Sequence, residues 1–181
     1  MVPIFTAWIG QGPADPALLA HMVRHVEVAF GTKVHPWSPP GPPRHAYDPR
    51  RRQHASGAIL KWILEVGPAP GARAGKFLGV TDQDLFIPIL TYVFGEAQLS
   101  GAAAVVSTAR LLEDVDLFGP RLLAERLAKE AVHELGHAFG LRHCATPRCV
   151  MGRSSGVRDV DEKGPVPCEE CRGRLEQQEG A

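Results

Sequence analysis

Two kinds of hydrophobic pattern open the chain. Residues 2–9, VPIFTAWI, form an apolar run rich in β-branched and aromatic residues, which predicts a buried strand. Asp15 followed by Pro16 is typical of a helix N-cap and the first helical position. Apolar residues then recur with helical spacing up to Gly31, where a glycine favours a helix end. The apolar positions of this helix, which we expect to pack on a sheet, are Leu19, Met22, Val23, Val26 and Phe30.

The pattern of the next forty residues is less regular. Residues 33–37 are compatible with a short strand, and the proline-rich stretch 38–49 is interpreted as a rigid connector. Asp48–Pro49 repeats the cap-then-proline signal, so we predict a second helix from there to about Glu65. Its apolar face comprises Ile59, Trp62, Ile63 and Val66.

Three arginines, Arg50, Arg51 and Arg52, would occupy the first turn of that second helix. Positive charge opposes the helix dipole at this end. Such a cluster is either a solvated group of charges or a contact for a substrate or anion, and the sequence favours the first interpretation.

The middle of the chain reads as a surface loop followed by strands. Residues 67–75, GPAPGARAG, predict the loop. Apolar and small residues then predict strands at 76–81, about 91–98 and 102–108. Between the first two lie Asp82 and Asp84, which are interpreted as a turn in preference to a pair of metal-binding carboxylates.

The longest helical pattern begins at Gly119–Pro120 and continues to about Phe139. Its apolar residues Ala128, Val132, Leu135 and Phe139 line one face. Three chemically active residues, His133, Glu134 and His137, project from another face. The order of strands and helices predicts an α/β fold, a sandwich of helices on a twisted mixed β-sheet.

Composition adds limits on the class of protein. A chain of 181 residues with 44% hydrophobic and 22% charged residues predicts one compact globular domain, 1–181. The formal net charge of zero gives no support for a nucleic-acid or membrane partner. The N-terminus lacks the basic start and long apolar region of a secretory signal. We therefore expect a cytoplasmic protein, in which the four cysteines serve as thiolates more readily than as disulfides.

His133 and His137 are four residues apart, so on a helix their imidazoles lie one turn apart on the same face and can hold one ion. Glu134 lies about a quarter turn round, where its carboxylate can accept a proton from a water that zinc activates. Gly140 allows the chain to turn sharply at the end of the helix, and His143 can then return as the third ligand. The whole pattern is H-E-x-x-H-x-x-G-x-x-H.

The cysteines form two close pairs, Cys144 with Cys149 and Cys168 with Cys171, separated by eighteen residues. Two such pairs joined by a loop are typical of a closed four-cysteine zinc site, which contributes folding energy and has no open position for chemistry. A disulfide, a redox switch and idle thiols are the alternatives. The paired spacing favours structural zinc.

The stretch HELGHAFGLRH, with Met151 eight residues beyond its third histidine, resembles the metzincin metallopeptidases. The added C-x₄-C-x-M and C-x-x-C pattern is similar to that of the archaemetzincins, as are LGVTDQDLFIP and VFGEAQ. The resemblance implies a minimal metzincin-like fold with backing helices, an active-site helix and a Met-turn. It also implies two subdomains, 1–140 and 141–181, the second carrying the Met-turn and the cysteines.

The resemblance further implies two zinc ions. One would be catalytic, bound by His133, His137 and His143 with Glu134 as general base. The other would be structural, bound by Cys144, Cys149, Cys168 and Cys171. A peptide or protein substrate would add, antiparallel, to an edge strand within 91–108, and we expect a monomer. Neither Tyr47 nor Tyr92 follows the methionine, so the tyrosine switch of some metzincins is not apparent.

Two functions are consistent with these residues. The first is a zinc-dependent metallopeptidase, either an aminopeptidase or an endopeptidase, which the intact Glu134 favours. The alternative is a zinc-containing peptide-binding protein with little or no turnover. The polar segment 152–167 is expected to have little local structure and to form one side of the substrate pocket.

His143 and Cys144 are adjacent although both are good zinc ligands. Consecutive side chains of an extended stretch point to opposite sides. We therefore predict that His143 faces the cleft, that Cys144 faces away from it, and that the two residues serve different zinc ions.

Overall fold

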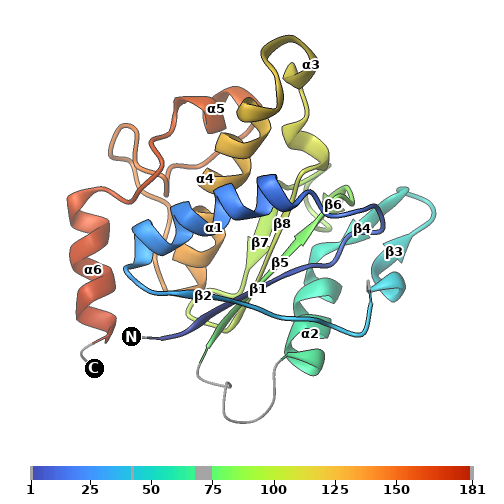
Figure 1. Ribbon diagram of the computed structural model, residues 1–181, viewed down its shortest axis with the longest axis horizontal. Helices are drawn as coiled ribbons and strands as arrows, with labels where there is room; N and C mark the ends of the chain where they lie inside the picture. The colour runs from blue at the N-terminus through green and yellow to red at the C-terminus, as the bar shows by residue number, and fades with distance from the viewer. Residues whose placement is uncertain (1, 42, 68–74, 180–181) are drawn as a thin grey trace.

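The computed structural model describes residues 2–41, 43–67 and 75–179, and its centre is a five-stranded sheet in the order β2-β1-β5-β8-β7 (Figure 1). The first four strands are parallel, and β7 is antiparallel to β8 at the edge. The five strands are β1 (Ile4–Trp8), β2 (Val34–Pro36), β5 (Lys76–Thr81), β7 (Gly95–Ala97) and β8 (Ala103–Ser107). This mixed α/β architecture confirms the predicted fold class, including the mixed sheet.

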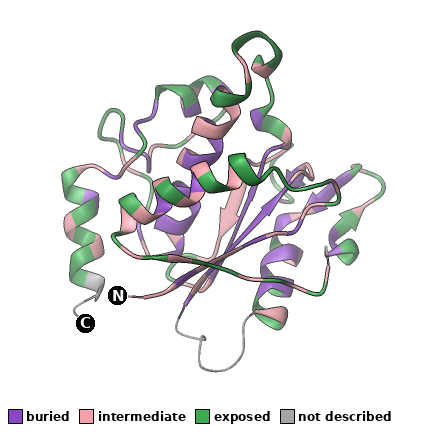
Figure 2. Ribbon diagram, viewed as in Figure 1, coloured by how far each residue is buried: buried purple, intermediate pink, exposed green. Residues whose placement is uncertain are grey.

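Helices cover both faces of the sheet. Ile4, Leu78 and Val106 belong to the buried cluster that includes residues of α1 (Pro16–Phe30) and α4 (Pro120–Ala138). Their sequence neighbours, such as Phe77 and Val105, belong to a second cluster with α2 (Ser56–Val66). Because adjacent residues of a strand point to opposite faces, the apolar strands supply both layers. Figure 2 shows the central strands β5 and β8 buried, whereas the edge strands β2 and β7 are more exposed.

Local signals define both ends of α1. The Asp15 carboxylate accepts hydrogen bonds from the backbone N–H groups of Ala17 and Leu18, and Gly31 has the left-handed conformation with φ of 62°. Both ends of the predicted first helix are therefore confirmed. The strands predicted at 2–9, 33–37, 76–81 and 102–108 are confirmed as well, within a residue or two of their ends.

The helix predicted from Asp48–Pro49 was wrong at its start. Asp48 does cap the N–H groups of Arg50 and Arg51, but it caps a turn, and α2 begins only at Ser56. A second sheet occupies the space between, with strands in the order β3-β4-β6. These strands are β3 (Tyr47–Asp48), β4 (Gln53–Ala55) and β6 (Leu85–Phe86), and the short helix η1 (Arg44–Ala46) precedes them.

The strand predicted at 91–98 is limited to the three residues of β7. Ile87 to Tyr92 form a turn, in which the Leu90 N–H bonds to the Ile87 carbonyl, and Val93 makes one isolated bridge to Leu85. Almost all of the predicted loop 67–75 lies outside the described residues.

The C-terminal segment contains more structure than predicted. Within 152–167, expected to have little local structure, α5 (Val157–Glu162) packs through buried Val157 and Val160. A further helix, α6 (Glu169–Glu179), ends the described chain. The short elements η3 (Ala109–Leu111) and α3 (Val115–Phe118) precede α4. Among the described residues, no helix combines the length and hydropathy that a membrane crossing requires.

Candidate active site

The end of α4 directs the chain back toward its own histidines. Gly140 has φ of 92°, and its N–H bonds to the His137 carbonyl. The Leu141 N–H bonds to the Gly136 carbonyl, which together with the first bond makes a Schellman cap. Leu141 is buried just after this turn, so the chain reverses and brings His143 back to the helix.

The three predicted histidines converge on one point. A ligand nitrogen from each of His133, His137 and His143 lies within 4.8 Å of the other two. The Nε2 atoms of His133 and His137 are 3.1 Å apart. Two nitrogens bound to one tetrahedral zinc at 2.0–2.1 Å would be about 3.3 Å apart, so the spacing suits a single ion.

Backbone carbonyls orient two of these rings. The Nδ1 of His133 is 2.8 Å from the Val150 carbonyl, and the Nδ1 of His137 is 2.7 Å from the Leu141 carbonyl. Each Nδ1 therefore carries the proton and donates it, which leaves Nε2 as the free donor atom for a metal. Burial lowers the pKa of all three histidines, most strongly that of His133, so the neutral form that binds a metal is favoured.

Glu134 lies beside the histidines in a space that a glycine provides. A Cβ at Gly95 of β7 would come within 2.6 Å of the Glu134 Cγ and of the Val105 carbonyl oxygen. Burial, assisted by the nearby Glu130, raises the pKa of Glu134 well above its ordinary value. The buried carboxylate is thus able to hold a proton, as a general base must after it has accepted one.

An ion pair lies next to His133, one helical turn before Glu134. The Lys163 Nζ is 2.9 Å from a carboxylate oxygen of Glu130, and both side chains are about 95% buried. The same Nζ is 3.4 Å from the Nδ1 of His133, where its charge further disfavours protonation of the ring. This pair links the chain just after α5 to the centre of α4.

Met151 packs against α4 at Gly136, between His133 and His137 in the sequence. It is fully buried in a turn in which the Gly152 N–H bonds to the Cys149 carbonyl. A Cβ at Gly136 would come within 2.5 Å of its sulfur. Only glycine at this position of α4 allows the methionine to lie directly against the helix.

The four cysteines form a second group away from the cleft. Cys144 and Cys168 have sulfurs 3.8 Å apart, and Cys149 and Cys171 have sulfurs 3.9 Å apart. Thiolates bound to one tetrahedral zinc at 2.3 Å would be about 3.8 Å apart, whereas a disulfide requires about 2.0 Å. The spacing therefore suits a four-thiolate metal site and not two disulfides.

Backbone N–H groups support this cluster. The Thr146 N–H donates to the Cys144 sulfur, and the Cys168 N–H donates to the Cys149 sulfur. A backbone hydrogen bond from Cys171 lowers the pKa of Cys168 to about 6, while burial raises the pKa of Cys171. In the metal-free chain the Cys168 thiolate is therefore favoured, whereas burial raises the pKa of Cys149 and of Cys171 and disfavours their deprotonation.

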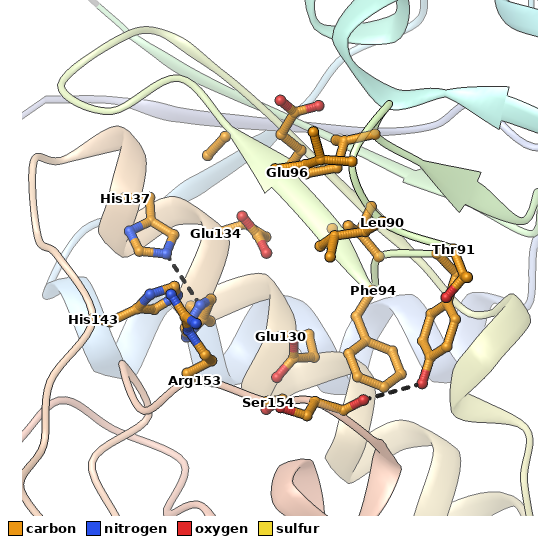
Figure 3. Close-up of a pocket in the computed structure, with 18 residues that line it drawn as sticks. Leu90, Thr91, Phe94, Glu96, Glu130, Glu134, His137, His143, Arg153 and Ser154 are labelled. Carbon is orange, nitrogen blue, oxygen red and sulfur yellow. Dashed lines mark hydrogen bonds between the residues drawn. The ribbon is translucent and has the colours of Figure 1, made fainter.

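A cavity of about 580 Å³ opens beside the histidines (Figure 3). Its lining includes His133, Glu134, His137 and His143 from the histidine group. The remaining lining comes from two opposite segments, Ile87 to Ala97 above and Arg153 to Ser155 below, together with Glu130. The segment 152–167 was expected to form one side of the pocket and an edge strand within 91–108 to lie above it, and residues of both line the cavity, whereas Ile87 to Leu90 and Glu130 were not predicted as part of a site.

Other candidates from the sequence have structural roles. Asp82 accepts hydrogen bonds from the N–H groups of Gln11 and Gly12, and Asp84 pairs with Arg110. These contacts agree with the interpretation of both carboxylates as part of a turn. Arg51 donates to the carbonyls of Leu90 and Thr91, a contact that neither interpretation of the arginine cluster foresaw.

Comparison with known proteins places these residues in context. Residues 74–177 match the model of Peptidase family M54. An archaemetzincin of Pyrococcus furiosus is 35% identical over 179 residues, 95% of this chain and 91% of that protein. The crystal structure of the Methanopyrus kandleri archaemetzincin superposes with a TM-score of 0.84 at 37% identity, covering 100% of this chain and 96% of that one. A zinc-dependent peptidase from Methanocorpusculum labreanum superposes with a TM-score of 0.83 at 26% identity, covering 97% and 100%.

Proposed function

Because this chain belongs, with the archaemetzincins, to peptidase family M54 and is a zinc metallopeptidase, we propose that His133, His137 and His143 bind its catalytic zinc and that Glu134 is the general base. Three imidazole nitrogens that converge within 4.8 Å beside a buried carboxylate are the observation that carries this proposal. Zinc held by three histidines keeps an open position, where it supplies Lewis acidity and lowers the pKa of water to about 7.

The free edge of β7 suits the binding of an extended peptide. The Phe94 carbonyl accepts from the Ser107 N–H, and the Gln98 N–H donates to the Ala103 carbonyl. Hydrogen-bonded and non-hydrogen-bonded pairs alternate in an antiparallel ladder, so Gly95 and Ala97 direct their backbone groups away from β8. A peptide substrate can add there, antiparallel to β7, with its scissile carbonyl near Glu134.

Glu134 moves the proton in the proposed reaction. Its carboxylate accepts a proton from the water that attacks the scissile carbonyl, and then donates that proton to the leaving amine. The raised pKa supports both steps, because a carboxylate in a nonpolar site holds the proton until it passes it to the leaving amine. The absence of a side chain at Gly95 lets the Glu134 side chain lie directly against β7.

The cysteine group is proposed to hold a second zinc with a structural role. Its four sulfurs leave no open position in tetrahedral geometry, so the ion stabilises the fold instead of reacting. It would connect the segment after His143, the Met151 turn and the start of α6.

Replacement of Glu134 by Gln tests the mechanism. Glutamine retains the volume of the side chain but cannot accept the proton, so kcat should fall by about 10²–10⁴ with little change in bound zinc. Peptide cleavage should be followed by mass spectrometry and zinc by elemental analysis. Glu125→Gln, on an exposed position of the same helix, is the matched control and should retain full activity. Wild-type rates in Glu134→Gln would contradict the assignment.

The alternative of a peptide-binding protein with little turnover gives no role to the Glu134 carboxylate. It predicts that zinc-loaded protein binds members of a diverse peptide library but releases no fragments. Fragments that appear with wild type and disappear with Glu134→Gln would exclude it.

A further inference from the structure

The cavity beside His133 lies between two walls that meet at one contact. The upper wall is the turn from Ile87 to Phe94 before β7, and the lower wall is the segment from Arg153 to Ser155 after the Met151 turn. The hydroxyl of Tyr92, in the upper wall, donates to the carbonyl of Ser155 at 3.4 Å. Figure 3 marks this hydrogen bond by a dashed line next to Ser154, away from the histidines.

The tyrosine ring is held on more than one side. It makes an edge-to-face contact with Phe94, with ring centroids 5.5 Å apart. The Arg110 guanidinium lies over the ring at 4.8 Å and is fixed by two hydrogen bonds to Asp84. Because Phe94 and Arg110 hold its ring, Tyr92 keeps its hydroxyl near the Ser155 carbonyl and spans the two walls as a bridge.

The segments on both sides of the Tyr92–Ser155 contact are held by hydrogen bonds to other parts of the fold. Arg51 donates to the Leu90 and Thr91 carbonyls at 2.7 and 3.1 Å, which ties the upper wall to the turn before β4. The Asp159 carboxylate of α5 accepts from the Ser155 N–H at 2.6 Å, which ties down the lower wall. The walls are therefore anchored independently of the contact between them.

The direction of a bound peptide determines which of its ends meets the bridge. Gly95 packs against Glu134, and beyond β7 the Ser100 N–H bonds to the His137 carbonyl. A peptide antiparallel to β7 thus runs from the His137 end toward Gly95 and then toward Tyr92. Tyr92 lies three positions before Gly95, in the turn that precedes β7, so an extended peptide meets it within about three residues of the position opposite Gly95.

We propose that the Tyr92–Ser155 bridge closes the cleft beyond the scissile bond, so that the enzyme cuts near the free C-terminal end of its substrates and releases fragments of about one to three residues. The inference deepens the proposed function and rests on it. The N-terminal part of a long substrate can extend beyond the His137 end of the cleft. Its C-terminal part meets the Tyr92–Ser155 bridge.

A series of peptides with one common cleavage site tests this limit. The N-terminal part is constant, and between one and about ten residues follow the bond that is cut. For the wild-type enzyme, kcat/KM should fall at least about tenfold once more than about three residues follow, because the bridge obstructs the longer chains. Equal kcat/KM across the series would overturn the inference and leave the proposed function intact. Failure to cut any peptide in a Glu134-dependent manner would overturn both.

Substitution of Tyr92 tests whether the Tyr92–Ser155 bridge causes this limit on substrate length. In Tyr92→Ala, the ratio of kcat/KM for long over short peptides should rise at least about tenfold above that of wild type. Tyr92→Phe keeps the packed ring and loses only the hydrogen bond, so its ratio should rise less. Tyr47→Ala, at the other tyrosine of the chain, is the matched control and should leave the ratio unchanged. A folded Tyr92→Ala with the wild-type ratio would overturn the inference. If that variant does not fold, the wild-type length series decides.

Discussion

At the scale of single residues, two glycines determine how closely other groups approach the histidine site. Gly136 leaves room for the Met151 sulfur, and Gly95 leaves room for the Glu134 side chain. In both cases a methyl group would overlap an atom of the site. These glycines are therefore needed for space and not for unusual backbone angles.

Gly136→Ala should lower the free energy of unfolding by about 1–3 kcal/mol, since overpacking must displace the fully buried Met151. Gly173→Ala on α6 is the matched control, because its new methyl group would meet no atom within 4 Å. That change should stabilise the protein by about 0.5–1 kcal/mol through helix propensity. Urea unfolding of the zinc-loaded proteins measures both. Equal stabilisation by the two substitutions would show that Met151 moves without cost.

Protonation of His133 should make the metal-free chain sensitive to acid. Burial holds the folded-state pKa of His133 well below the unfolded value of about 6.5. The unfolded chain therefore binds more protons, and stability falls as the pH drops below about 6.5 toward the folded-state pKa. The slope should be shallower in His133→Gln.

The raised pKa values of Glu130 and Glu134 add a dependence of stability on pH with the opposite sign, and this contribution is present in both the wild type and His133→Gln. The comparison is therefore between the two metal-free proteins, by urea unfolding at several pH values between about 5 and 8. Identical slopes would remove His133 as the source of the acid sensitivity.

At the scale of elements, α4 is joined to the C-terminal segment by two ion pairs, of which Lys163–Glu130 is buried on both sides. Lys163 pairs with Glu130, and Arg126 makes two hydrogen bonds to Asp161. Lys163, Glu130 and Arg126 are buried, whereas Asp161 is exposed, and α5 cannot shift without breaking both pairs. The position of the lower cleft wall, Arg153 to Ser155, depends on this attachment.

Lys163→Met should lower the free energy of unfolding by about 3–5 kcal/mol, because it leaves the Glu130 carboxylate buried without its partner. The double variant Glu130→Gln with Lys163→Met should recover part of that loss, since no buried charge remains unpaired. Arg121→Met, which breaks an exposed pair on the same helix, should change stability by less than about 1 kcal/mol. Urea unfolding gives all three values. A double variant no more stable than Lys163→Met would argue against the ion pair.

At the scale of the whole molecule, features set by neighbouring residues could be predicted from the sequence, whereas features that depend on contacts between distant segments could not. The histidines, Glu134, Gly140 and Met151 all lie within nineteen consecutive residues, and helix geometry alone relates most of them. The caps of α1 could be predicted for the same reason. Asp48 was misread because an Asp before Pro caps a turn as well as a helix, and only the pairing of β4 with distant β6 distinguishes them.

The remaining parts of the cleft come from distant segments. Lys163 reaches His133, and Tyr92 and Ser155 reach the cleft wall, only because the sheet edge and α5 pack around α4. No spacing in the sequence relates these residues to His133. The short helix α5 is likewise stabilised by burial of Val157 and Val160, a tertiary effect that its six residues do not encode by themselves.

The whole chain should bind two zinc ions with different accessibility. A mild chelator should remove the histidine-bound ion first and abolish cleavage while the protein remains folded, because that site has an open position. Removal of the cysteine-bound ion should require stronger chelation and cause unfolding. Zinc content, cleavage and circular dichroism are measured during one titration. Simultaneous loss of both ions and of structure would contradict separate roles.

His143 and Cys144 are consecutive residues that belong to different ligand groups. One peptide unit separates the groups, and a single inserted residue would exchange the sides to which the two side chains point. The two groups are therefore not independent modules. A designer who transplants the histidine site into another scaffold has to carry the cysteine-bearing segment with it, because within the described residues the backbone next to His143 is held by the bond from the Cys144 N–H to the Met151 carbonyl.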